Sequence, residues 1–394
     1  MSNTKTALVR FTPLEPYFLG GESTHGSLGA DANYFSQSNP YPQQTTLLGT
    51  LRNLLRLAGY DFGASSFSPK DTTKPQYGHL LNISPLFLQN GAGNLYLPQA
   101  LDRHDNRGQP FQISQLDKEE EWLLFDGEKS FKKAARWESY DPEKAEGYNP
   151  KEDLADEWVS LDGERLKPDT IFKTFIRPGI PKRELHKREP DTPGFFKQEL
   201  IKISDGWSFA VVAEFDAQVD FEKLNGATAQ LGGEKSIFQI TVKEERRSFE
   251  QIFPKEKMYY KENLSNLPRL VLVSDAEMPE EAWKHTAAAA TETVDFRHLQ
   301  TFYDTKSKTQ NVKIGGLTKI QPLGKKTDHE KWLEENTLSD KHPLGKSTKF
   351  TLLRRGSVLV CPDTTALTAL AGALTLEPWR TAGFNHFFTY QPIL

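Results

Sequence analysis

The chain has 394 residues, with 49 lysines and arginines against 53 aspartates and glutamates, for a formal net charge of −4. This balance excludes a general electrostatic affinity for nucleic acid, so any such affinity must be local. Hydrophobic residues make up 37% and aromatic residues 11% of the chain, which supports packed cores and excludes global disorder. The length favours two or three domains.

A single cysteine, Cys361, excludes an intramolecular disulfide framework and a zinc site built from several thiolates. The first residues contain no apolar secretory core, and no apolar run approaches the ~20 residues of a membrane span. We therefore expect a soluble, cytoplasmic protein with no membrane partner.

The N-terminal region predicts a strand, a long loop and a helix. Residues 6–12 form a short β-type run, and about thirty residues rich in proline and glycine follow. In residues 43–59, leucines recur at helical spacing. Thr45 or Thr46 is suited to cap the start of this helix, and Gly59 to end it. Arg52 and Arg56 share its polar side.

The next segment predicts a hairpin and then an acidic insertion. Residues 83–89 and 95–98 flank the turn sequence NGAGN, which is typical of a β-hairpin. The DRHD sequence at 102–105 reads as a solvated turn. Residues 117–164 hold 16 acidic and 7 basic side chains, a local charge of −9. We expect them to form a helical, solvated insertion.

The charge then reverses. Residues 165–203 carry 10 basic and 5 acidic side chains. ELIKIS and WSFAVVAEF, joined by Ser204-Asp205-Gly206, predict a second hairpin. Strands are also predicted after LGGE at 231–234, at 269–276 and at 350–361, with a helix at 364–374. This order favours two α+β units over one parallel sheet.

Catalytic and metal motifs are absent from the sequence. The nine histidines are scattered, and HExxH, CxxC, EF-hand, GxSxG, Walker A and GxGxxG patterns do not occur. The sequence therefore indicates no metal and no cofactor, and gives no support for nucleophilic or nucleotide-driven catalysis.

Three groups of glycines and basic residues are candidates for RNA contact. Each also has a plainer interpretation, as a β-bulge, a solvated loop or core packing respectively. The first group lies around LGGE, the second in FIRPGIPKR, and the third near the C-terminus. Their members are Gly232, Gly233, Lys235, Arg246 and Arg247; Arg177, Gly179, Lys182 and Arg183; and Arg380 and His386.

In this order, the segments resemble the third-subunit family of the Cmr effector complexes of type III-B CRISPR systems, part of the RAMP superfamily. FTPLEPYFLGGE is similar to the family's opening strand and loop, and its helix signature recurs at Thr46, Gly49 and Arg52. SPLFLQNGAGNLYLPQALD, FIRPGI, LGGEKSIFQITV and RRGSVLVC follow in the family's order. The chain departs from the family at Lys235, where an arginine is usual, in AGFNHFFTY, and in the acidic insertion.

The resemblance implies an α+β chain of two ferredoxin-like, RRM-type domains with long loops. Residues 1–205 would form the first, with the acidic helical insertion at about 117–164, and residues 206–394 the second. It also implies a non-catalytic RNA-binding subunit of an antiviral ribonucleoprotein. Its partners would be the 5′ tag of the guide RNA (crRNA), the large polymerase-like subunit and the RAMP backbone subunits, with target RNA contacted indirectly. Thr46 and Arg52 join the RNA-binding candidates on this basis.

Two alternatives remain open. RAMP-type proteins include metal-independent endoribonucleases that process guide precursors, commonly with an early histidine, and His25 lies in the first loop with Tyr34 nearby. A histidine acid/base assisted by Lys70 or Lys74 is suited to cleave RNA through the 2′-OH. A scaffold that contacts only protein is the second alternative, and salt-dependent RNA affinity would count against it.

Overall fold

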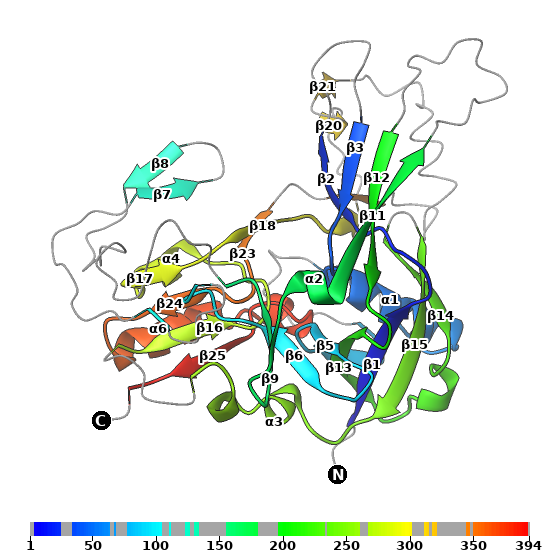
Figure 1. Cartoon of the computed structure of the whole chain (residues 1–394), viewed down its shortest axis with the longest axis horizontal. Coiled ribbons are helices and arrows are strands. Elements are labelled where there is room, and N and C mark those ends of the chain that lie inside the picture. The colour runs from blue at the N-terminus through cyan, green and yellow to red at the C-terminus, as the bar shows by residue number, and fades with distance from the viewer. Residues whose placement is uncertain are drawn as a thin grey trace.

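The protein is a mixed α+β structure, rich in strands (Figure 1). This computed structural model describes residues 4–24, 34–63, 67, 77–104, 110–111, 123–126, 130–133, 155–179, 196–232, 235–260, 267–301, 311–314, 317–320, 344–346 and 350–392. Within these ranges, no helix is long and apolar enough to cross a membrane. His25, Lys70, Lys74, Lys182, Arg183 and Gly233 lie outside the described residues.

A nine-stranded antiparallel sheet forms the centre of the molecule. Its order is β10-β9-β6-β5-β13-β1-β15-β14, and β4 also pairs with β13. Strand β1 confirms the predicted N-terminal strand, because Ala7, Val9 and Phe11 alternate with more exposed residues and face the core. The bounds are Thr4–Pro13 (β1), Leu80–Ile83 (β4), Phe87–Gln89 (β5), Leu95–Pro98 (β6), Trp158–Ser160 (β9), Arg165–Leu166 (β10), Ser208–Asp216 (β13), Thr228–Leu231 (β14) and Ser236–Glu244 (β15).

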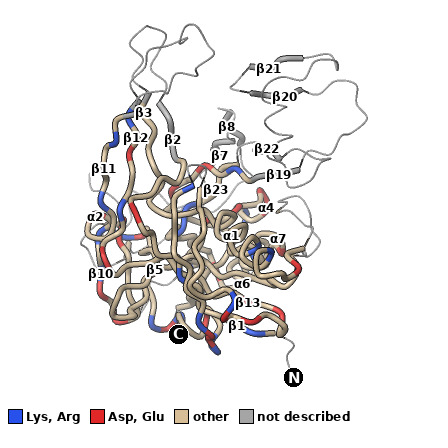
Figure 2. The backbone as a smooth tube through the Cα atoms, turned by 90° about the vertical axis from the view of Figure 1, so that its right-hand side faces the viewer, with Lys and Arg blue, Asp and Glu red and all other residues tan. Residues whose placement is uncertain are grey.

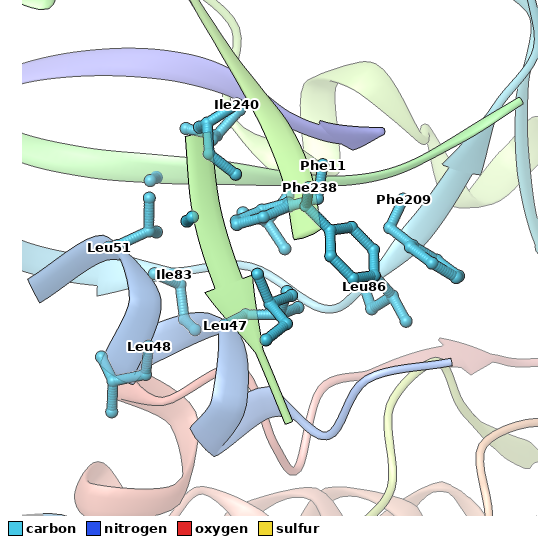
Figure 3. Packing of buried hydrophobic residues seen from close by; sticks show 14 of the residues in the cluster. Phe11, Leu47, Leu48, Leu51, Ile83, Leu86, Phe209, Phe238 and Ile240 are labelled. Atoms are coloured by element: carbon cyan, nitrogen blue, oxygen red, sulfur yellow. The ribbon is translucent and has the colours of Figure 1, made fainter. Parts of the chain in front are cut away.

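Helix α1 (Gln44–Leu57) covers one face of this sheet and confirms the predicted amphipathic helix. Its leucines pack on Phe11, Phe209, Phe238 and Ile240, as Figure 3 shows. The predicted cap is wrong, since the N-cap is Gln43, without a side-chain hydrogen bond, and Thr45 and Thr46 lie in the first turn. Gly59 follows the helix at φ +82°, and Tyr60 N donates to Leu55 O (2.9 Å), so the helix ends as predicted.

A second sheet, in the order β11-β12-β3-β2, projects from the body at the top of Figure 1. We call strands β11 (Phe172–Gly179) and β12 (Phe196–Ile203) the arm. The short helix α2 (Pro168–Ile171) leads into it, and β3 (Tyr34–Ser38) and β2 (Gly20–Thr24) complete the sheet.

The predicted hairpin of residues 199–215 is wrong. The turn itself forms, with Gly206 at φ +82° and Trp207 N donating to Ser204 O (3.1 Å). The two strands nevertheless enter different sheets, since β12 pairs with β11 and β3 while β13 pairs with β1, β4 and β5. Strand β13 is buried along most of its length, as a central strand covered on both faces must be. By contrast, β5 and β6 form the predicted hairpin across NGAGN.

The C-terminal part contains a four-stranded sheet, in the order β17-β24-β16-β25. Its strands are β16 (Arg269–Leu272), β17 (Ala288–Ala290), β24 (Val358–Val360) and β25 (Phe387–Tyr390). One face packs against the central sheet, where Val271, Val358 and Phe388 share a cluster with Ala210 and Val212 of β13. The other face is covered by α6 (Thr364–Leu374), the predicted small-residue helix, and by α4 (Glu280–Trp283).

Shorter elements complete the structure. The helical ones are α3 (Phe249–Ile252), α7 (Glu377–Thr381) and the 3₁₀ turns η2 (Phe221–Lys223) and η3 (Lys255–Lys257). The strand pairs are β7 (Leu123–Asp126) with β8 (Ser130–Lys133), β18 (Thr293–Phe296) with β23 (Phe350–Leu353), β19 (Leu299–Thr301) with β22 (Leu344–Lys346), and β20 (Asn311–Ile314) with β21 (Leu317–Ile320).

The central sheet contains strands from both sides of the predicted boundary at residues 205 and 206. Strands β13 and β15 flank β1 directly. The division that we propose therefore moves to the stretch between β15 and β16. The two parts are closely joined, since Gln44 Nε2 of α1 donates to Ser84 O (3.0 Å) and to Gly383 O (2.8 Å), next to the C-terminal sheet.

The acidic segment is not helical where it is described. Within 117–164, residues 123–126 and 130–133 pair as antiparallel strands. Residues 158–160 form β9, which extends the central sheet beside β6. Trp158 and Val159 are buried there, so the end of the segment belongs to the core and not to a solvated insertion.

The first three residues of the DRHD sequence are also buried, contrary to the prediction of a solvated turn. Asp102, Arg103 and His104 are at most 3% exposed. Asp102 accepts hydrogen bonds from Tyr260 Oη (2.5 Å) and from Arg269 Nη1 of β16. A charge this deep requires such partners, and both come from residues more than 150 positions away in the sequence.

Candidate nucleic-acid interface

One face of the arm carries exposed basic and aromatic side chains. Lys173, Phe175 and Arg177 alternate along β11 and therefore point to the same side. They lie opposite Lys202, Leu200 and Gln198 of β12. Lys173, Arg177 and Lys202 are exposed, and Phe175 is 46% exposed. Figure 2 shows basic positions spaced along β11. We call this surface the outer face of the arm.

The opposite face anchors the base of the arm in the core. Phe172, Ile201 and Ile203 are buried there. Tyr17 forms an antiparallel bridge with Ile201, with N–O distances of 2.8 and 2.9 Å, and its ring packs on Phe209 at 5.8 Å. Tyr17 Oη also donates to Pro40 O (2.6 Å). The arm therefore projects from a fixed base.

The glycine turn between β14 and β15 touches this base. Gly232 has φ +76°, and a Cβ there would lie 3.0 Å from Phe18 O. Phe18 N donates to Ser236 Oγ (2.9 Å). At Gly232, the chain's own backbone therefore approaches the turn closely. Lys235 belongs to the same turn. Its side chain is exposed, and its backbone has a left-handed conformation, with φ 58°.

Charge on the outer face is predominantly positive in the described part. Lys202 Nζ lies 3.3 Å from Asp205 Oδ1, an exposed pair of little energetic weight. Lys173 and Arg177 are open to solvent and form no ion pair with an acidic side chain of the described residues. Cations beside an exposed aromatic ring are suited to hold phosphates while one base stacks on the ring.

Arg246 and Arg247 do not join this group. They follow β15 at the end opposite Lys235, so the nine residues of the strand separate them. Arg247 pairs with Glu245 (3.0 Å), and this hydrogen-bonded partner lowers the pKa of the Glu245 carboxyl. The prediction that these arginines lie near Lys235 is wrong, because an extended strand of this length spans roughly 30 Å.

Thr46 and Arg52 lie on α1 and not on the arm. The Thr46 carbonyl accepts a hydrogen bond from Thr50 Oγ1 (2.8 Å). The Arg52 guanidinium donates to Phe62 O (2.8 Å) and Gly63 O (2.7 Å) and lies 5.2 Å from the Tyr77 ring centroid. Arg52 thus fixes the loop after its own helix.

Arg380 and His386 lie in the C-terminal part. Arg380 is half-buried over the Phe387 ring (5.6 Å), and His386 is 7% exposed, with Nε2 3.2 Å from Arg380 O. Burial, together with the positive charge of Arg380, lowers the pKa of His386 to about 4. The imidazole is therefore neutral at pH 7 and packed in the interior.

His386 gives stability a defined pH dependence. The unfolded pKa is about 6.5, so between that pH and about 4 the unfolded chain binds more protons than the folded one. The stability that the neutral His386 contributes is fully present above pH 6.5 and is lost as the pH falls. Between pH 7 and 4.5, we expect the free energy of unfolding to fall by about 2 kcal/mol more in the wild type than in His386→Gln, as measured by urea unfolding. Equal losses in the two proteins would contradict this assignment.

Sequence reasoning selected Arg177 and Gly179 as candidates but did not select Lys173, Phe175 or Lys202, which lie on the same arm. The signal was present in the sequence FKTFIRPG, in which basic and aromatic residues alternate with period 2 before the glycine. Gly179 ends β11 opposite Phe196. In the part of the chain that the structure describes, no group of three or more metal-binding side chains was found.

Comparison with known proteins places the chain in a family. Residues 9–390 match the family model described as CRISPR-associated protein (Cas_Cmr3). The chain belongs to this family. No curated protein matches it.

Two solved structures share similarity along most of the chain. A chain of the type III-B Cmr-beta complex bound to cognate target RNA, determined by cryo-EM, is 12% identical, with 98% of this chain and 96% of that chain covered and a TM-score of 0.47. A chain of the same complex bound to cognate target RNA and AMPPnP, state 1, is 14% identical, with coverages of 90% and 86% and a TM-score of 0.41.

Proposed function

We propose that this Cas_Cmr3 family member is the third, RAMP-superfamily subunit of a type III-B Cmr ribonucleoprotein in the cytoplasm. In this role it holds the 5′ tag of the guide RNA without cleaving it. It docks the large polymerase-like subunit, contacts the RAMP backbone subunits, and meets target RNA only through the assembly. Family membership supports the CRISPR assignment.

The outer face of the arm is the observation that carries RNA binding in this proposal. Lys173 and Arg177 are spaced along one exposed strand face, with Phe175 between them. Single-stranded RNA is held by phosphate contacts and by stacking of its unpaired bases on aromatic rings. Lys235 at the base of the arm extends the positive charge.

Substitution of the arm cations is expected to weaken guide RNA binding and to reduce its salt dependence. For single strands, each lost phosphate contact lowers the slope of log K against log salt by roughly 0.7, so Lys173→Ala/Arg177→Ala should lower it by about 1.4. Phe175→Ala removes a stacking platform worth about 1–3 kcal/mol. Fluorescence anisotropy of tagged guide RNA on the assembled complex, at several salt concentrations, measures both effects.

Arg246→Ala/Arg247→Ala is the matched control, because it removes two cations at the far end of β15. Its salt slope and affinity should equal those of the wild type. If the control loses as much affinity as the arm variant, or if neither variant loses any, the arm is not the RNA-binding surface.

A further inference from the structure

The outer edge of β15 is only partly covered. Strand β14 pairs with β15 no farther than Gln239. Beyond it, Ile240 N donates to Ala227 O (2.7 Å). Val242 N donates to the side chain of Asn225, at 3.0 Å from Oδ1. After Val242, no strand in the described part of the chain pairs with this edge.

The backbone groups of Glu244 face this edge. Glu245 N donates to Thr6 O (2.9 Å), so residue 245 pairs with β1. Successive residues of a strand direct their N–H and C=O groups to opposite edges. The N–H and C=O of Glu244, and the C=O of Val242, therefore point away from β1. They are a donor and two acceptors that an added strand can use.

A cleft of about 530 Å³ lies beside this edge. Val242 and Glu244 line it from β15, and Asp220, Glu222 and Asn225 line it from the segment that follows β13. Ligand-binding clefts typically measure roughly 300–1,000 Å³, so the volume is sufficient for an occupant. All of these residues belong to the described part of the chain, and the cleft is open without movement of any segment.

The charge of the cleft favours a cationic occupant. The lining holds three carboxylates and two ammonium groups, from Asp220, Glu222 and Glu244 and from Lys5 and Lys243. Lys5 Nζ already donates to Val219 O (3.3 Å), which engages one of the two cations. The excess of carboxylates attracts lysine or arginine and repels the phosphates of nucleic acid.

We propose that the edge of β15 at residues 242–244 binds an extended, basic segment of another protein chain, which adds to the central sheet as a strand. Main-chain hydrogen bonds to Val242 and Glu244 supply affinity, and the carboxylates of the cleft supply the preference for lysine or arginine. Charged side chains such as Lys243 and Glu244 often protect an edge from uncontrolled pairing. Here they select a segment of complementary charge. This protein contact is separate from the arm and does not depend on guide RNA binding.

The test uses the full chain and a blocked, fluorescein-labelled octapeptide of alternating valine and lysine, observed by fluorescence anisotropy. Glu244→Pro removes the N–H that faces the cleft and leaves the hydrogen bonds to β1 in place, whereas Glu244→Ala removes only the carboxylate. Glu244→Ala should weaken binding about fivefold at most, and Glu244→Pro should bind at least roughly tenfold more weakly than Glu244→Ala.

Gln230→Pro is the matched control. It removes an N–H that points away from β15, at the outer edge of β14, and should bind the peptide like the wild type. A peptide of alternating valine and glutamate should bind at least roughly tenfold more weakly than the lysine peptide. Circular dichroism and a cooperative melt establish that each variant is folded.

Hydrogen exchange of the wild type, resolved to single amides, tests the pairing without any substitution. Saturation with the lysine peptide should slow exchange of the Glu244 amide at least tenfold and leave the Gln230 amide unchanged. Unchanged exchange at Glu244, equal binding by folded Glu244→Pro and Glu244→Ala, equal binding of the two peptides, or no binding at millimolar peptide would each overturn the proposal. If Glu244→Pro does not fold, the exchange measurement decides.

Failure of this proposal is distinguishable from failure of the proposed function. The peptide assay contains no RNA and reports on the β15 edge, whereas guide RNA binding with the Lys173 and Arg177 substitutions reports on the arm.

Discussion

Replacing Gly356 with alanine is expected to lower the free energy of unfolding by about 3–5 kcal/mol. Gly356 has φ +88°, where an L-residue is strained, and a Cβ would lie 2.5 Å from the backbone oxygen of Gln99. Its backbone also joins two parts of the chain, since its N–H donates to Leu272 O (2.7 Å) and its oxygen accepts from Leu101 N (2.8 Å). Relief of the clash would disturb both bonds.

Gly226→Ala is the matched control for Gly356→Ala. Gly226 has a similar φ of +75°, but nothing lies within 4 Å of the Cβ position. Its substitution carries only the backbone strain, about 1 kcal/mol. Urea unfolding of both variants separates the steric contribution from the conformational one. An equal decrease in the free energy of unfolding of the two variants would show that the clash with Gln99 contributes nothing to the destabilisation.

Asp102→Ala is also expected to lower the free energy of unfolding strongly, by about 3–5 kcal/mol. Arg269 is fully buried and donates to Asp102 and to Phe111 O (2.7 Å). Removing the carboxylate takes away the negative charge that both Arg269 and Arg103 contact in the interior. Breaking a buried network of ion pairs and hydrogen bonds is among the most destabilising consequences of a point mutation.

Asp205→Ala provides the comparison for Asp102→Ala, because Asp205 pairs with Lys202 at an exposed position. Its substitution should change the stability by less than about 1 kcal/mol. Thermal unfolding of the two variants by calorimetry compares a buried with an exposed ion pair in one protein. A small effect at Asp102 would mean that the buried cluster relaxes or admits water.

Local patterns predicted the elements whose burial follows from their own sequence. Helix α1 and strand β1 were found because their apolar residues recur at the helical and strand periods and face one core. The glycines at 59 and 206 were also assigned correctly to a helix end and a turn, since both need positive φ. The two-domain ferredoxin-like arrangement stays a proposal.

Pairing between distant segments was not readable from the sequence. The turn at 204–206 has a sequence typical of a hairpin. Strand β13 nevertheless pairs with β1, which lies some two hundred residues earlier in the chain. The acidic segment 117–164 was predicted as solvated from its charge, yet Trp158 enters the central sheet beside β6. The local composition of a strand does not determine which distant strand it pairs with.

The candidate interface was only partly predictable for the same reason. Arg177 and Lys235 are more than fifty residues apart, and the bridge from Tyr17 to Ile201 places the arm beside the glycine turn. Arg246 is closer to Lys235 in sequence but lies at the other end of β15. His386 was selected for its chemistry, while its burial depends on the packing of the whole C-terminal part.

The most direct measurement is photo-crosslinking of the tagged protein in its native assembly, followed by sequencing of the attached RNA and identification of the crosslinked peptide. We expect short RNAs that share one constant 5′ sequence, attached to the β11 peptide that contains Phe175. RNA without a constant 5′ end, or crosslinks confined to peptides outside the arm, would contradict the proposed guide-holding role of this surface.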